Sequence, residues 1–95
     1  MIEPNDILGR RNEIKGYVAD ADLIRAVNRC IDFFRDFKIE EDDEPILISH
    51  DLKLIIAKEK EGGIKPLEAF EQKKFIAQRI LFLTKDFSNI QSRTW

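Results

Sequence analysis

The feature that most constrains this chain is a glycine- and proline-containing turn between two long amphipathic segments. Gly62 and Gly63 follow the first segment, and Pro66 opens the second. A glycine can take the left-handed conformation that ends a helix, and Ile64 can then fold back onto the helix just finished. Proline suits the first turn of the next helix. Because the connection is so short, it predicts an antiparallel C-terminal helical hairpin.

Apolar residues recur at helical spacing along the whole chain, and no segment shows the alternation of a strand. The predicted helices cover about residues 5–18, 20–38, 45–61 and 66–90. Asn5 is the expected N-cap of the first helix. The stretch Ile39–Glu44 is expected to be a linker, because five adjacent acidic residues repel one another. We therefore predict one all-α domain over residues 1–95, a four-helix bundle.

The second and later helices carry clear apolar faces. In the second helix this face holds Leu23, Val27, Cys30, Ile31 and Phe34, with Arg25, Arg29 and Asp32 mostly opposite. The third helix carries its main stripe at Ile48, Leu52, Ile55 and Ile56 and a second stripe at Leu47 and Leu54. The fourth carries a side stripe at Phe75 and Phe82 beside its main seam. A helix with two stripes usually touches two neighbours, so the spacing favours a core role for Phe75 and Phe82. The alternative is a contact site, if part of the stripe stays exposed.

The sequence contains few candidate catalytic or metal-binding residues. Cys30 is the single cysteine and His50 the single histidine. A Cys–His pair is conceivable, but the apolar surroundings of Cys30 favour a buried, inert thiol. His50 is predicted to be solvated and to point away from Asp51. No metal-ligand set and no phosphate-binding glycine loop occurs, so we expect no cofactor, no metal site and no enzyme activity.

Charge and hydropathy narrow the class of partner. The net charge of −2 argues against nucleic-acid binding, and we expect the basic residues of the fourth helix, Lys73, Lys74, Arg79 and Lys85, to form a solvated face. No apolar stretch approaches the ~20 residues of a membrane span. One cysteine and no signal peptide predict a reducing, cytoplasmic setting.

Several motifs together match a known pattern. Ile46–Ser49 is an apolar opening with a serine, Lys58–Glu61 is a charged segment, and Gly62, Ile64 and Glu68 mark a turn and a helix start. A closing helix follows with Ile76, Ile80, Leu81 and Leu83. With the upstream segment VADADLIRAVNRCIDFF, residues 18–34, the pattern resembles the bacterial effector-associated domains over about two thirds of the chain.

This resemblance implies a fold and a role. The domains of that family are small, helical and somewhat like death-fold domains. They are thought to be adaptors in bacterial conflict and signalling proteins. Matching copies pair between a sensor or NTPase and an effector such as a TIR or protease domain. The resemblance names no catalytic residue. It leaves the chain as either the N-terminal piece of a longer protein or a stand-alone adaptor.

We therefore predict an adaptor that binds another protein. The expected partner is a matching helical domain on an effector or sensor, and self-association is a further possibility. The candidate contact residues are acidic, polar, basic and aromatic: Glu40, Glu41, Asp42, Asp43, Glu71, Lys74, Gln78, Lys85, Phe75 and Phe82. An acidic corner at residues 40–44 and a basic fourth helix could dock head to tail. The alternatives are an antitoxin-like regulator of one unrelated partner, a nucleic-acid-binding domain and an enzyme fragment.

Overall fold

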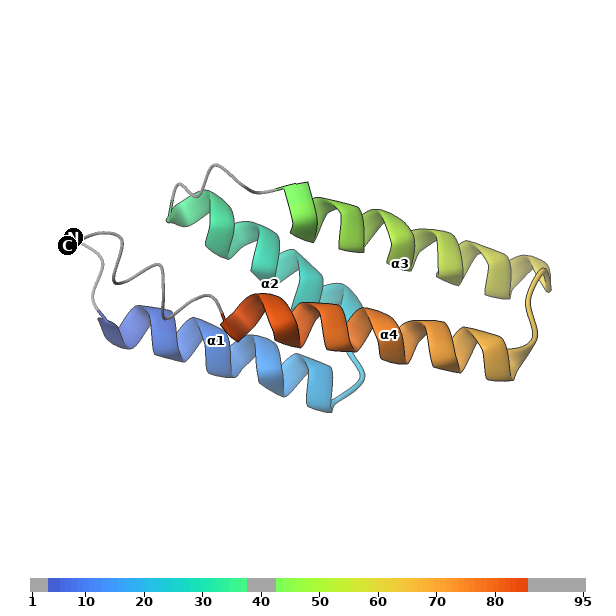
Figure 1. Cartoon of the computed structure of the whole chain (residues 1–95), viewed down its shortest axis with the longest axis horizontal. Coiled ribbons are helices and arrows are strands. Elements are labelled where there is room, and N and C mark those ends of the chain that lie inside the picture. The colour runs from blue at the N-terminus through green and yellow to red at the C-terminus, as the bar shows by residue number, and fades with distance from the viewer. Residues whose placement is uncertain (1–3, 38–42, 86–95) are drawn as a thin grey trace.

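The computed structural model describes residues 4–37 and 43–85, and over these ranges the chain forms four α-helices and no strand. The helices are α1 (Pro4–Ala19), α2 (Leu23–Asp36), α3 (Asp43–Glu61) and α4 (Pro66–Lys85) (Figure 1). The prediction of an all-helical fold with four helices is confirmed.

The helices pack in two pairs. α1 lies against α2 and α3 lies against α4, while α2 also contacts α3 and α4. α1 touches α4 but, within the described ranges, not α3. Figure 1 shows α3 and α4 extending together beyond the ends of α1 and α2, toward the turn that joins them. At that end, the α3–α4 pair has no helical neighbour among the residues that the structure describes.

Each helix contributes fully buried side chains to a single core. Ile14 of α1, Phe33 of α2, Ile48 of α3 and Ile80 of α4 are all solvent-inaccessible. Burying a side chain of this size stabilises a fold by roughly 1.5–3 kcal/mol. The buried hydroxyl of Thr84 is satisfied, because it donates a hydrogen bond to the carbonyl of Leu81 at 2.7 Å.

The turn from α1 to α2 corrects a predicted boundary. The amide of Asp22 donates to the carbonyl of Tyr17 at 2.8 Å, and that of Ala21 donates to Val18 at 3.0 Å. These two bonds end α1, and Ala21 takes a left-handed conformation with φ of 60°. The Asp22 side chain then accepts from the amide of Arg25 and caps α2. The predicted start of this helix at residue 20 is therefore wrong.

Other helix ends also differ from the prediction. α1 begins at Pro4, so Asn5 lies inside the helix and is not its N-cap. Asp43 and Glu44, expected in the linker, form the first turn of α3, where acidic side chains favour the helix dipole. Pro45 follows them in that turn and is buried. The predicted helical residues 38 and 86–90, and the linker residues 39–42, lie outside the described ranges.

The turn from α3 to α4 confirms the role predicted for its glycines. Gly62 has a φ of 72°, which is the left-handed region. The amide of Gly63 donates to the carbonyl of Lys58 at 2.8 Å, and the amide of Gly62 donates to Glu59 at 3.2 Å. Ile64 packs against the core as expected. This is the same hydrogen-bond pattern as at Ala21, here with glycine at the left-handed position.

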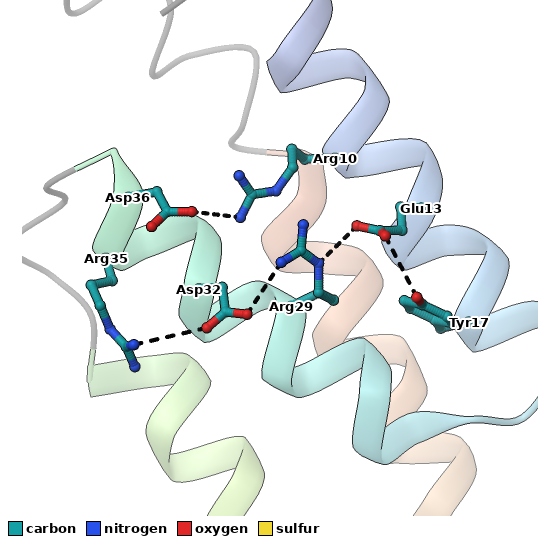
Figure 2. Close-up of polar contacts among 7 residues, drawn as sticks. All are labelled: Arg10, Glu13, Tyr17, Arg29, Asp32, Arg35 and Asp36. Atoms are coloured by element: carbon teal, nitrogen blue, oxygen red, sulfur yellow. Dashed lines mark hydrogen bonds and ion pairs between the residues drawn. The ribbon is translucent and has the colours of Figure 1, made fainter.

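Ion pairs join α1 to α2 (Figure 2). Arg29 donates to Glu13 at 2.8 Å and to Asp32 at 3.2 Å, and Arg10 donates to Asp36 at 2.9 Å. The hydrogen bond to Glu13 raises the pKa of Arg29. Arg29 was expected on the solvated side of its helix, but it is half-buried against α1. The reason is that α1 covers the flank of α2 beside the apolar face.

Candidate protein-interaction surface

Two pairs of apolar side chains remain exposed on α3 and α4. Leu47 and Leu54 keep 51% and 48% of their surface exposed, and Phe75 and Phe82 keep 62% and 65%. Each pair is seven residues apart, which places its members on one face of their helix. We call these four residues the α3–α4 strip. The predicted core role of Phe75 and Phe82 is therefore wrong.

The strip is exposed because the core side of each helix is already occupied. Ile48, Leu52 and Ile55 turn one face of α3 inward, and Ile76, Ile80 and Leu83 do the same for α4. α3 has no contact with α1 in the described residues, and α4 contacts α1, α2 and α3. None of the four helices over residues 4–37 and 43–85 covers the second stripe of α3 or of α4.

An open groove runs between α3 and α4 along part of the strip. It has a volume of about 490 Å³, and Leu54 and Phe75 line it together with the core residues Ile55 and Ile76. Charged and polar groups complete its lining: Asp51, Lys58, Glu68, Glu71, Gln72 and Arg79. The groove therefore offers an apolar floor with a polar rim, the composition that is typical of protein contact sites.

Arg79 connects the two helices inside the strip. Its guanidinium donates to Asp51 at 2.7 Å and to Glu44 at 3.1 Å. The hydrogen bond from Arg79 holds the pKa of Asp51 below its ordinary value, and the bond to Asp51 raises the pKa of Arg79. Helical spacing places Arg79 one turn from Phe75 and from Phe82. The ion pairs therefore fix α4 against α3 between the two exposed phenylalanines.

His50 differs from its prediction in one respect. It is exposed, as expected, but its Nδ1 lies 3.3 Å from a carboxylate oxygen of Asp51 instead of pointing away. This contact also lowers the pKa of Asp51, after the larger effect of Arg79.

The structure brings six of the predicted contact residues together on one helix. Glu71, Lys74, Phe75, Gln78, Phe82 and Lys85 are all exposed on α4. Lys85 lies over the ring of Phe82, with its Nζ 5.9 Å from the centroid. Asp43 is exposed in the first turn of α3, not on α4. Glu40, Glu41 and Asp42 lie outside the described ranges.

Two basic residues of α4 that were expected on a solvated face are paired within the chain. Lys73 forms a salt bridge with Glu59, and Arg79 is held by the acidic groups of α3. Glu44, the last residue of the acidic run, is likewise paired inside the chain. These pairings leave less charge for the head-to-tail contact between the acidic run and α4.

Leu47 and Leu54 are not among the predicted contact residues, although their spacing predicts a second stripe on the third helix. Helical spacing shows that two residues share a face of a helix, but it does not show whether that face is buried or exposed. The structure also exposes apolar side chains elsewhere: Leu8, Ile24, Ile46, Leu67 and Phe70. Leu67 and Phe70 lie in the first turns of α4, close to the turn that extends beyond α1 and α2.

Cys30 is fully buried, and burial raises the pKa of its thiol to about 12. His50 is exposed, so the two residues occupy different environments. Among residues 4–37 and 43–85, no group of three histidine, cysteine or acidic side chains is placed to hold a metal ion. None of the four helices, over the residues described, is long and apolar enough to cross a bilayer.

Comparison of the chain with protein families, with curated proteins and with solved structures finds no match. The resemblance to bacterial effector-associated domains therefore stays a prediction.

Proposed function

We propose that this chain is a protein–protein interaction adaptor that recruits an effector in a bacterial defence or signalling system. It acts by binding, without catalysis, in the cytoplasm. Its fold in this proposal is a death-fold-like four-helix bundle in which α3 and α4 form an antiparallel hairpin. The partner is a matching helical domain on an effector or sensor.

The observation that carries the proposal is the exposure of the α3–α4 strip. Two phenylalanines and two leucines stay about half exposed or more. A domain of this size needs most of its large apolar side chains for its core, so leaving four of them exposed calls for a reason. Large aromatic side chains are the usual anchors of protein interfaces. A helical partner of the same kind suits the strip, because its apolar residues follow the seven-residue spacing that helix-on-helix packing uses.

Site-specific photo-cross-linking in the native host tests this function. A photoreactive phenylalanine analogue is placed at position 75 or 82. Position 28 is the control, because Asn28 is exposed on α2 and does not line the groove between α3 and α4. The proposal expects one protein that carries a matching helical domain to be cross-linked from positions 75 and 82 but not from 28. Cross-linking to an unrelated single partner would instead identify an antitoxin-like regulator, and equal or absent cross-linking at all three positions would exclude the strip as the docking site.

A further inference from the structure

A continuous exposed stripe runs along α4. Its members are spaced alternately four and three residues apart, which keeps them on one face of the helix: Glu71, Phe75, Gln78, Phe82 and Lys85. All five are exposed. This stripe contains the aromatic half of the α3–α4 strip and spans about 21 Å of helix, at 1.5 Å per residue.

The stripe is complementary to itself when it is reversed. Its two phenylalanines lie at almost equal distances on either side of Gln78. Its two ends carry opposite charges, Glu71 near the start of α4 and Lys85 at its end. In an antiparallel pair of such helices, each Phe75 meets Phe82 of the other copy, and each Glu71 meets Lys85. A parallel pair would place like charges opposite each other.

We propose that the partner of this stripe is a second copy of the chain, bound through an antiparallel α4–α4 contact with a two-fold axis at Gln78. This inference rests on the proposed function and names the partner of the same surface. A two-fold axis repeats every favourable contact twice and closes the assembly at a dimer.

The flank of α3 extends the contact. Leu54 lies beside Phe75 in the groove between α3 and α4, and this groove is open to an incoming aromatic side chain. Phe82 of the second copy faces this point in the antiparallel pairing. Leu47 shares its face of α3 with Leu54 and adds apolar surface nearer the carboxyl end of α4.

The size of this surface sets the expected affinity. Two helices side by side, about 30 Å long and about 20 Å wide, offer a footprint on the order of 600 Å² per protomer. That is below the ~800 Å² per partner of a standard interface. We therefore expect a weak dimer whose population depends on protein concentration.

Charge reversal at the ends of the stripe tests the antiparallel pairing. The measurement is light scattering behind a sizing column, over a concentration series and at low salt, for the native chain and for E71K, K85E and E71K/K85E. Each single change places like charges opposite each other twice. Loss of the two attractive pairs, at about 0.2–1 kcal/mol each, is expected to weaken the dimer by roughly 2- to 30-fold. The double variant restores opposite charges across the axis and returns to near-native dimerisation.

Mixing the two single variants provides a second arm. One copy of E71K and one of K85E bring opposite charges together at both ends, so the mixture dimerises although each variant alone does so poorly. K53E is the matched control for K85E, because Lys53 is exposed on α3 and does not line the groove. Circular dichroism and thermal unfolding confirm that every variant is folded.

Three results would overturn the proposal: a native chain that is monomeric at every concentration, an E71K variant that dimerises like the native chain, or a double variant no better than the singles. A monomeric native chain that still cross-links to another protein from positions 75 and 82 would remove the self-pairing and leave the adaptor function standing. A native chain that is monomeric and also forms no cross-link from positions 75 and 82 would exclude both the self-pairing and the adaptor function.

Discussion

At the scale of single residues, burial decides which groups can react. Cys30 has no solvent-accessible surface and a thiol pKa of about 12. Compared with an ordinary thiol, this raised pKa lowers the fraction of reactive thiolate at neutral pH.

We therefore expect Cys30 to resist thiol–disulfide exchange in the folded protein and to react at once in denaturant. The measurement is the rate of reaction with a chromogenic disulfide reagent across a denaturant series. Fast labelling in native buffer would show that α2 does not bury the thiol as described.

Asp51 carries the clearest dependence of stability on pH. Its pKa is lowered in the folded state by Arg79 and then by His50, so the folded protein binds its proton less readily than the unfolded chain does. The stabilisation is therefore fully present above the ordinary aspartate pKa of about 4 and is lost as the pH falls through the lower, folded-state value. The effect is small, since the Asp51 side chain is 43% exposed and solvent screens the pair.

An NMR titration of the Asp51 carboxyl checks this expectation. The native chain should titrate below the ordinary aspartate range, and R79Q should move the midpoint upward while leaving the contribution of His50. An unchanged midpoint in R79Q would mean that the ion pair is not formed in solution.

At the scale of helices and turns, two connections use one hydrogen-bond pattern with different residues. Gly62 takes the left-handed conformation at the end of α3, and Ala21 takes it after α1. Alanine in that conformation costs about 1–2 kcal/mol, because its Cβ approaches the carbonyl oxygen, whereas glycine has no such cost.

This difference predicts opposite effects for a matched pair of substitutions. We expect G62A to lower the free energy of unfolding by about 1 kcal/mol. A21G should raise it by roughly 0.5 kcal/mol, since relief of strain is partly offset by the greater backbone entropy of glycine in the unfolded chain. Denaturant unfolding of both variants is the measurement. Effects of the same sign would argue against the shared left-handed geometry.

At the scale of the whole molecule, the packing places Phe33 and Phe75 in different environments. Phe33 is fully buried and stacks on Phe37 with ring centroids 4.3 Å apart. Phe75 is 62% exposed on the α3–α4 strip.

Replacing each by alanine separates the two groups. F33A should cost about 3–5 kcal/mol of unfolding free energy, because it leaves a cavity in the core. F75A should cost less than about 1 kcal/mol when measured at protein concentrations too low for self-association. Equal losses would indicate that Phe75 is packed in the folded monomer.

Much of the helical framework follows from the sequence by local physics. Three features depend only on residues within a few helical turns of each other: the glycine turn, the proline that opens α4 and the apolar face of α2. The sequence therefore predicts them without knowledge of the tertiary packing. The ends of the helices were predicted less accurately. Asp22 caps α2 only because Ala21 takes a left-handed conformation, which alanine rarely adopts.

The sequence by itself determined which residues share a face of each helix, because helical spacing is a local property. It placed Phe75 and Phe82 on one stripe, and Leu47 and Leu54 on another. Only the tertiary structure decided that these stripes stay exposed, since burial depends on where the neighbouring helices lie. The same holds for Arg79 and Arg29, whose partners are distant along the chain and come within hydrogen-bond reach only when the helices pack.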